Sequence, residues 1–370
     1  MYKKSEMQVQ HWHSTAFTHL NTYSPFCPLS KMSGKFVLIT GVTGYIGGQV
    51  VESFLQAGYR VRGTVRGAKI NQLTATNGLE FVQIDDIADA DFTEALKGVD
   101  AVVHTACNIA GGASAEKMLA TSIDGTMNLL RQAEKHGIKN FVVTGSCANC
   151  VDYTTPLSTS FVGANISEKD WGIGTRESAL ARSEDTIYVY AVAKMLAEKA
   201  VWEFAKTHPH VKVAAILPGL VYGPFSSRFP SPTSVGALST MGLPFCLLNG
   251  IVPTMVVAPW VTDVRDVGKA HVLALELPKL EPSADVEARR FLLCGGSYTW
   301  KEASADLKAA LPKELGEKIT DRADLPDLPG PPSTLDAARA RDVLGLEFIP
   351  PRKTIQDAII SLVEIQKAWK

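Results

Sequence analysis

A tyrosine and a lysine four positions apart could carry acid–base chemistry. Tyr190 and Lys194 open the segment YAVAKMLAEKAVWEFAK, whose pattern predicts a helix over 190–207. Side chains four residues apart lie on one helix face, so the phenol and the ammonium project in the same direction. A free phenol has a pKa of about 10, and a neighbouring cation favours the ionised form and lowers that pKa. The pair could therefore exchange a proton with a substrate near neutral pH, although a surface aromatic–cation pair would show the same spacing.

Ser146 is a second candidate for chemistry. It closes the apolar run NFVVTGS (140–146), which we expect to form a buried strand. Ligands of open α/β sheets bind at the carboxyl ends of the strands. A hydroxyl there could hydrogen-bond a substrate oxygen and stabilise the negative charge that develops on it. Taken alone, Ser146 could equally satisfy the backbone at a strand end.

A glycine-rich turn indicates a nucleotide site. TGVTGYIG (40–47) lies between an expected strand and an expected helix, with Gly41, Gly44 and Gly47 in the spacing GxxGxxG. Glycines permit a tight turn and let the backbone approach a pyrophosphate, which the free amides at a helix N-terminus can bind. Outside this context three glycines would be an ordinary turn, but between a strand and a helix they favour a dinucleotide.

The second expected strand favours NADP(H) over NAD(H). An NAD site usually places an acid about 20 residues beyond the glycines, to bind the ribose 2′-hydroxyl. The segment YRVRGTVR (59–66) has no acid there and ends in an arginine. We predict that Arg66 binds a 2′-phosphate, because its planar guanidinium suits that group, and that Lys69 could assist. We interpret Arg62 as a solvated side chain.

These residues are positioned by alternating strands and helices. Apolar runs predict strands over 35–40, 60–65, 80–85, 100–106, 140–146 and 212–218, and periodic segments predict helices over 49–58, 91–97, 115–136 and 190–207. This alternation predicts an α/β protein with a Rossmann-type doubly wound parallel sheet and a smaller C-terminal substrate-binding lobe. His104 ends a buried strand, so we expect it to be a hydrogen-bonded core histidine.

The chain divides into four parts on this reading. Residues 1–33 show no hydrophobic period, and we expect a disordered N-terminal extension; a mitochondrial presequence is disfavoured, and Met32 could be a natural start. We assign 34–224 to the NADP-binding domain, rejoined by about 261–280. We assign 225–260 and 281–351 to the substrate-binding lobe, and 352–370 to a C-terminal helix. The uncharged part of the lobe predicts an apolar pocket.

The composition disfavours several classes of protein. A net charge of −1 over 370 residues gives no electrostatic reason to bind nucleic acid or an anionic membrane, and no apolar run is long enough to span one. Six cysteines are sparse and indicate reduced thiols in an intracellular protein. Cys147 and Cys150 lack a second pair at zinc spacing, so we expect structural thiols and no metal, with a redox-sensitive pair as the alternative. We expect a cytoplasmic monomer or homodimer that acts on a small molecule.

The order of the glycine turn, the strand-end serine and the YxxxK helix resembles the extended short-chain dehydrogenase/reductase superfamily. Further segments resemble the branch that includes dihydroflavonol reductase, cinnamoyl-CoA reductase and the fungal aldehyde, ketone and methylglyoxal reductases. They are VRGTVR, DDI (85–87), VVHTA (102–106), DGTMNLL (124–130), SEKDW (167–171), LPGLVYGP (217–224), VTDVRDVGKAH (261–271) and LGLEF. The chain departs from that branch at Gly145, where a second Ser or Thr is common, at Ser122, where some members have Asn, and in lacking the KNWYCY-type segment of cinnamoyl-CoA reductases.

The resemblance implies roles for individual residues. Tyr190 would donate a proton to a carbonyl oxygen held by Ser146, while Lys194 would bind the nicotinamide ribose and tune Tyr190. The other residues implied to bind the cofactor are Gly41, Thr43, Gly44, Tyr45, Ile46 and Gly47 at the pyrophosphate, Arg66 at the 2′-phosphate, Asp86 and Ile87 at the adenine, and Thr105, Ala106, Pro218 and Val221 toward the nicotinamide. Cys107, Trp171, Tyr222 and Phe225 are candidates for the substrate pocket.

The sequence therefore predicts an NADPH-dependent oxidoreductase that reduces an aldehyde or ketone to an alcohol. One alternative is an NADP-dependent epimerase or dehydratase of a sugar-type substrate, which would need cationic groups to hold a diphosphate. The other is a non-catalytic NADP-binding regulator, a class that typically lacks the Tyr/Lys pair.

Overall fold

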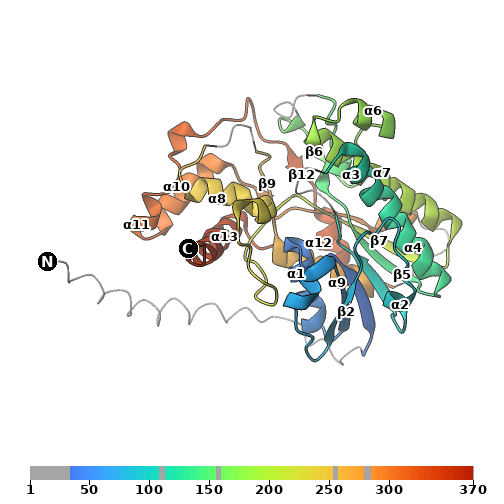
Figure 1. Ribbon diagram of the computed structural model, residues 1–370. Helices are drawn as coiled ribbons and strands as arrows, with labels where there is room; N and C mark the ends of the chain where they lie inside the picture. The colour runs from blue at the N-terminus through green and yellow to red at the C-terminus, as the bar shows by residue number, and fades with distance from the viewer. Residues whose placement is uncertain (1–33, 108–112, 156–159, 253–256, 279–284, 370) are drawn as a thin grey trace.

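A seven-stranded parallel sheet forms the centre of the protein (Figure 1). The computed structural model describes residues 34–107, 113–155, 160–252, 257–278 and 285–369, so the expected extension 1–33, with Met32, lies outside the described residues. The strand order is β10-β7-β5-β4-β1-β2-β3. The strands are β1 (Phe36–Thr40), β2 (Arg60–Val65), β3 (Leu79–Gln83), β4 (Ala101–His104), β5 (Asn140–Thr144), β7 (Lys212–Pro218) and β10 (Arg290–Leu293). The predicted Rossmann-type doubly wound sheet is confirmed.

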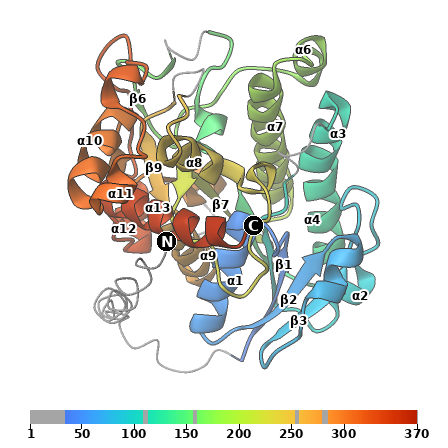
Figure 2. The same ribbon diagram turned by 60° about the vertical axis from the view of Figure 1, so that its left-hand side comes forward.

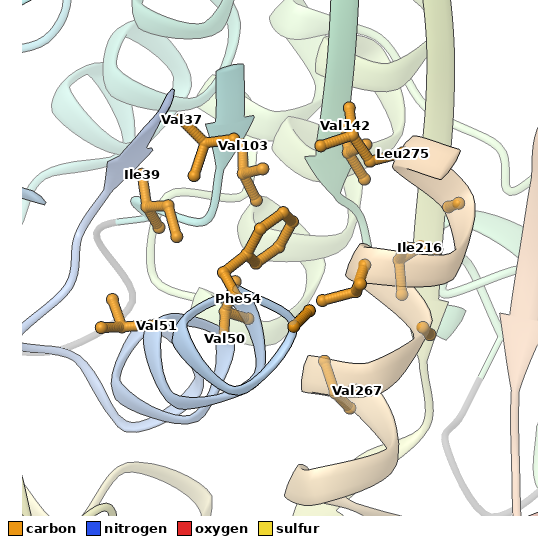
Figure 3. Packing of buried hydrophobic residues seen from close by; sticks show 14 of the residues in the cluster. Val37, Ile39, Val50, Val51, Phe54, Val103, Val142, Ile216, Val267 and Leu275 are labelled. Carbon is orange, nitrogen blue, oxygen red and sulfur yellow. The ribbon is translucent and has the colours of Figure 1, made fainter. Parts of the chain in front are cut away.

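Helices cover both faces of this sheet (Figure 2). One face carries α1 (Tyr45–Gln56), α9 (Val264–Glu276) and α12 (Ala338–Leu344), and the other carries α2 (Thr93–Leu96), α4 (Gly125–Lys135) and α7 (Thr186–Thr207). The side chains of alternate residues of β1 pack into the two helical layers, because successive side chains of a strand point to opposite faces of the sheet. Val37 and Ile39 join the α1 side, where Phe54 packs over the sheet (Figure 3), whereas Phe36 and Leu38 join the α7 side. Burial on both faces explains the continuous apolar runs in the sequence.

A smaller lobe packs beside the sheet, at the left of Figure 1. Its helices are α8 (Gly242–Leu248), α10 (Trp300–Ala310), α11 (Lys313–Gly316) and α13 (Pro351–Lys367). Small sheets of β8 (Leu220–Tyr222), β9 (Trp260–Asp263) and β11 (Gly296–Ser297), and of β6 (Asn165–Ile166) and β12 (Thr334–Leu335), join the lobe to the main sheet. Phe245, Leu307 and Ile359 lie in the core of the lobe. Within the described residues, the remaining α-helices are α3 (Ala115–Leu119) and α6 (Arg176–Ala181).

Three local expectations need correction. Residues 281–351 were expected in the lobe, but β10 pairs with β7 at the edge of the main sheet, and Ala340 and Leu344 of α12 pack in the sheet's own core. The expected helix 115–136 is interrupted by a π-helical turn at Ala120–Asp124. Helix α7, which carries Tyr190 and Lys194, begins at Thr186 rather than at position 190. The Asp185 carboxylate caps it by accepting a hydrogen bond from the Tyr188 amide at 3.0 Å.

A buried ion pair joins the edge strand β10 to helix α7. Arg290 is 0% exposed, and its Nε donates to Oε1 of Glu198, itself 2% exposed, at 2.8 Å. The Nη1 group of Arg290 donates to the backbone carbonyls of Glu168 at 2.6 Å and Asp170 at 2.7 Å. The guanidinium also lies 3.7 Å from the ring centroid of Trp171. These contacts satisfy a cation that burial would otherwise destabilise.

The Glu198 carboxylate accepts hydrogen bonds from two further side chains. Its Oε2 accepts from Nδ2 of Asn149 at 2.6 Å, and its Oε1 accepts from Nε1 of Trp202 at 3.0 Å. Asn149 lies in η3 (Cys147–Cys150), the short turn that follows Ser146. The carboxylate therefore fixes α7 to the turn after the predicted catalytic serine.

We predict that Glu198→Ala destabilises the protein by about 3–5 kcal/mol, because it leaves Arg290 buried without its counter-ion. The free energy of unfolding from urea titration would measure this loss. Glu317→Ala is the control, since Glu317 pairs with Lys313 where both side chains are largely exposed, and such pairs contribute little. Equal effects of the two substitutions would contradict the structural role of the buried pair.

Candidate functional site

A cavity of about 560 Å³ follows the carboxyl ends of the central strands, where ligands of open α/β sheets bind. Many of the residues singled out from the sequence line it together. They are Gly41, Thr43, Gly44, Tyr45, Ile46, Gly47, Arg66, Asp86, Ile87, Thr105, Ala106, Cys107, Tyr190, Lys194 and Phe225. One cavity thus joins the glycine turn to the Tyr/Lys pair.

The glycine turn leaves no room for side chains at two of its positions. A Cβ on Gly47 would lie 2.2 Å from the carbonyl oxygen of Gly41, and a Cβ on Gly41 would lie 2.8 Å from Cα of Ala106. Gly41 also has a φ of +70°, which favours glycine. Helix α1 starts directly after the turn, with no side-chain cap and no acidic residue in its first turn. Its backbone amides are therefore suited to the pyrophosphate of a dinucleotide, and the residues present fit such a group.

His104 holds the part of the cavity wall that packs against this turn. It is 3% exposed, and its Nε2 lies 3.0 Å from Oγ1 of Thr126, whose own hydroxyl donates to a backbone carbonyl. Nε2 must therefore be the donor, and Nδ1 accepts from Thr40 Oγ1 at 2.8 Å. Thr40 Oγ1 in turn accepts from the amides of Thr105 and Ala106 at 3.2 and 3.1 Å. Burial lowers the pKa of His104 to about 3, so it stays neutral, as a core histidine, which is what we predicted.

The far end of the cavity is charged. Asp86 forms an ion pair with Lys117, and this hydrogen bond is the main cause that lowers the pKa of Asp86, with Arg66 adding to it. Asp85 accepts from the amide of Gly67 at 2.6 Å. Within the described part of the chain, the exposed guanidinium of Arg66 has no hydrogen bond or ion pair of its own. It is therefore available to a phosphate.

Arg62 is not the solvated side chain that we expected. Its Nε donates to Glu80 at 2.6 Å, and its Nη1 donates to the carbonyls of Ala95 at 2.8 Å and Lys97 at 2.9 Å. The guanidinium also lies over the Phe36 ring. Arg62 ties the strands to the turn after α2, and it does not line the cavity.

Ser146 and Tyr190 come together beside the end of β5. Ser146 is 9% exposed, caps η3 by accepting from the Ala148 amide at 3.2 Å, and hydrogen-bonds to the Tyr190 phenol. Lys194 is also 9% exposed and donates from Nζ to the carbonyl of Thr144 at 2.6 Å. Burial raises the pKa of Tyr190, and the Ser146 hydrogen bond lowers it only in part. The expectation that Lys194 lowers this pKa is therefore not met in the structure, and Tyr190 carries its proton.

His271 supports this arrangement and was missed in the sequence. Its Nδ1 donates to the carbonyl of Val267 at 2.8 Å, so its Nε2 accepts from the Thr144 hydroxyl at 2.7 Å. Burial lowers the pKa of His271 to about 4, and the ring stays neutral. The same residue, Thr144, thus binds His271 through its side chain and Lys194 through its backbone. A histidine within a helix pattern gives no sequence signal for this contact.

Five candidates are not among the residues that line the cavity: Ser146, whose neighbours Thr144 and Gly145 do line it, and Trp171, Pro218, Val221 and Tyr222. Trp171 packs under Arg290, and Tyr222 is 1% exposed and packs edge-on against Trp300, 5.6 Å between centroids. Pro218 and Val221 are buried at β7 and β8. The structure therefore gives Trp171 and Tyr222 packing roles.

The segment 225–239 forms a wall of the cavity that no single motif identified. Phe229 packs against Phe81 of β3, with 6.3 Å between ring centroids, and Arg228 pairs with Glu52 of α1 at 2.5 Å. Nε1 of Trp369 donates to the Pro232 carbonyl at 2.7 Å. Its Pro/Ser-rich sequence indicated only a loop in the lobe, whereas these contacts bring it onto the cofactor side.

Gly145 and the CxxC pair have packing explanations. A Cβ on Gly145 would lie 2.4 Å from Cδ2 of Leu217, so glycine suits this position in this chain. Cys147 and Cys150 are free and buried, and burial raises the pKa of both thiols, that of Cys150 to about 12. They are inert, structural thiols, as predicted.

The described residues were also searched for other kinds of site. They contain no cluster of three or more His, Cys, Asp or Glu side chains that could hold a metal ion. Among the same residues, no helix combines the length and the apolar character needed to cross a bilayer.

The comparisons with known proteins agree on one family. Residues 37–286 match the model of the NAD dependent epimerase/dehydratase family. The chain is 34% identical to an uncharacterized oxidoreductase of Schizosaccharomyces pombe, covering 92% of this chain and 100% of that protein. It is 29% identical to aldehyde reductase 2 of Sporidiobolus salmonicolor, covering 90% and 97%. It is also similar to the solved structure of Gre2 from Candida albicans in complex with NADPH, with a TM-score of 0.73, 25% identity, and 90% and 99% of the two chains covered.

We predict that Gly47→Ala disrupts the glycine turn, because its Cβ would overlap the Gly41 carbonyl. The overlap should cost about 1–3 kcal/mol of stability and abolish tight binding of NADPH. Thermal unfolding and quenching of tryptophan fluorescence by NADPH would measure the two effects. Gly242→Ala is the matched control, since nothing lies within 4 Å of a Cβ there. Unchanged NADPH binding by Gly47→Ala would contradict the placement of the pyrophosphate.

Proposed function

The chain belongs to the NAD dependent epimerase/dehydratase family, and we propose that it uses NADPH to reduce an aldehyde or ketone to an alcohol. The predicted extended short-chain dehydrogenase/reductase family is confirmed, as are the oxidoreductase class and NADP(H) as cofactor, by the named relatives and by the NADPH complex of a similar structure. That Tyr190 donates the proton is our proposal.

One observation carries this proposal. A single cavity runs from Arg66, past the glycine turn, to Tyr190 and Lys194. This order matches a dinucleotide stretched along the strand ends, with its phosphate-bearing ribose at Arg66 and its reactive ring beside the phenol. A buried, protonated phenol at that end suits reduction, because a carbonyl that accepts a hydride must also gain a proton on oxygen.

We assign the following roles to the chain's own residues. NADPH, when bound, supplies a hydride to the carbonyl carbon. The amides at the start of α1 hold the pyrophosphate, Arg66 holds the 2′-phosphate, and Lys194 holds the nicotinamide ribose. Ser146 hydrogen-bonds the carbonyl oxygen and stabilises the charge that develops on it. Tyr190 gives its proton to that oxygen, which completes the alcohol.

The charges in the cavity disfavour a nucleotide-sugar substrate. Its described lining contains four cationic side chains, Arg66, Lys69, Lys117 and Lys194. Lys194 points to the Thr144 carbonyl, Lys117 pairs with Asp86, and Arg66 and Lys69 lie at the opposite end from Tyr190. No other cationic side chain of the described lining lies beside Tyr190 to hold the diphosphate of a sugar nucleotide. We therefore favour a reductase over an epimerase or dehydratase. A redox-regulated binding protein is disfavoured because the CxxC thiols are buried and protonated.

We predict that Tyr190→Phe lowers kcat for NADPH-dependent carbonyl reduction by at least about 100-fold, the usual contribution of a positioned general acid. NADPH affinity should change little, because the ring and Lys194 remain. Rates of NADPH oxidation against a panel of aldehydes and ketones would test this. Turnover that persists at the wild-type rate in Tyr190→Phe would contradict the assignment.

We predict separately that Arg66→Ala raises the Kd for NADPH and leaves the Kd for NADH nearly unchanged, because only NADPH carries the 2′-phosphate. Loss of one charge-assisted contact should cost about 1.5–3 kcal/mol, or roughly 10- to 150-fold in affinity. Fluorescence titrations with both cofactors would measure the two constants. A preference for NADPH that Arg66→Ala leaves intact would show that another residue selects the cofactor.

A further inference from the structure

A segment that follows β8 forms part of the cover of the cofactor cavity. We call residues 225–233 the strap. All of them except Ser227 and Arg228 line the cavity that also contains the glycine turn. Ser227 and Arg228 are exposed, so the strap lies between the cavity and solvent at this point. A dinucleotide bound along the glycine turn would therefore lie against the inner side of the strap.

The strap is not held by backbone pairing. Residues 225–233 form no backbone–backbone hydrogen bond with any residue that the structure describes. Two of them, Pro230 and Pro232, have no amide hydrogen to donate. A segment with few backbone hydrogen bonds opens at a low cost in free energy. The position of the strap therefore depends on a small number of side-chain contacts.

Two contacts join the strap to the nucleotide-binding part of the fold. The buried ring of Phe229 packs against Phe81 of β3, and it lies 3.3 Å from the position that a Cβ on Gly48 of α1 would occupy. Arg228 pairs with Glu52 of α1, but the two side chains are 37% and 26% exposed, and ion pairs in contact with solvent contribute little. Phe229 is therefore the main anchor on this side.

Trp369 joins the strap to the smaller lobe. It comes directly after α13, and its Nε1 donates to the carbonyl of Pro232 at 2.7 Å. Its ring packs against Phe245 of α8, with 5.6 Å between the ring centroids, so the indole is held by the lobe. Among the described residues, this is the only hydrogen bond between the lobe and residues 226–233. The end of the chain thus holds the strap from the side opposite to Phe229.

We propose that Trp369 is a positioning residue that latches the strap over the bound dinucleotide, and that this hydrogen bond breaks whenever the cofactor is exchanged. The inference rests on the proposed function, which places NADPH in this cavity. The strap must move aside for the dinucleotide to enter and again for it to leave. The same bond breaks in both directions, so the latch slows both steps by one factor and leaves the equilibrium affinity unchanged.

The test uses Trp369→Phe, which keeps an aromatic ring beside Phe245 and removes the indole N–H. Stopped-flow measurement of NADPH fluorescence gives the association rate constant on mixing, and the dissociation rate constant when excess NADP⁺ displaces bound NADPH. Both rate constants should rise about three- to tenfold, the worth of one neutral hydrogen bond. The Kd for NADPH should stay within about twofold of the wild-type value, which also reports that the variant is folded.

Gln366→Ala is the matched control. It removes a hydrogen bond of 3.1 Å from the same end of α13 to Asn249, which does not belong to the strap. Its two rate constants should stay within about twofold of wild type. Wild-type rate constants in Trp369→Phe, or an equal rise in Gln366→Ala, would overturn the latch.

The ratio of the two rate constants separates a latch from a structural support of the site. Faster dissociation of NADPH from Trp369→Phe with unchanged association, and therefore a higher Kd, would show that Trp369 supports the binding site itself, and would also overturn the latch. Wild-type protein that binds NADPH and reduces no carbonyl would overturn the proposed function alone, because the latch is measured without a substrate.

Discussion

The buried ion pair between Arg290 and Glu198 holds the candidate catalytic groups in one unit. Glu198 stands one helical turn beyond Lys194 on α7, and it also binds Asn149 in the turn after Ser146. Arg290 comes from β10, an edge strand of the sheet, so this strand supports the site although Arg290 does not line the cavity. No water can solvate these two charges if they separate, so each would become an uncompensated buried charge. The pair therefore restricts movement of β10 relative to α7. The geometry of the serine, the tyrosine and the lysine follows from this constraint.

Burial decides the protonation states around that unit. His104 and His271 are neutral and act as fixed hydrogen-bond donors and acceptors, one for the wall that faces the glycine turn and one for the strand end that holds Lys194. Tyr190 keeps its proton because its surroundings disfavour a phenolate. Free charge is confined to the opposite end of the cavity, near Arg66. The site therefore separates phosphate binding from proton transfer along its length.

The sequence was informative where local chemistry and local structure coincide. The GxxGxxG turn and the YxxxK helix can each be recognised from the spacing of a few neighbouring residues. The apolar runs predicted six of the seven strands of the sheet. It was uninformative where distant segments meet. Trp171 was expected near a substrate, yet it stacks on Arg290 from a strand about 120 positions away, a contact that no local pattern encodes. The wall at 225–239 and the pairing of Arg62 likewise depend on partners that only the fold brings close.

Our central proposal is that NADPH bound in this cavity transfers its hydride to the carbonyl carbon of the substrate and does not take it back. The most direct measurement uses NADPH with deuterium at both C4 positions of the nicotinamide ring, and mass spectrometry of the products. The account predicts one deuterium on the carbinol carbon of the alcohol for each NADPH oxidised. Products without deuterium, with the labelled NADPH recovered unoxidised, would contradict it and would instead indicate an epimerase-like reaction that returns its hydride.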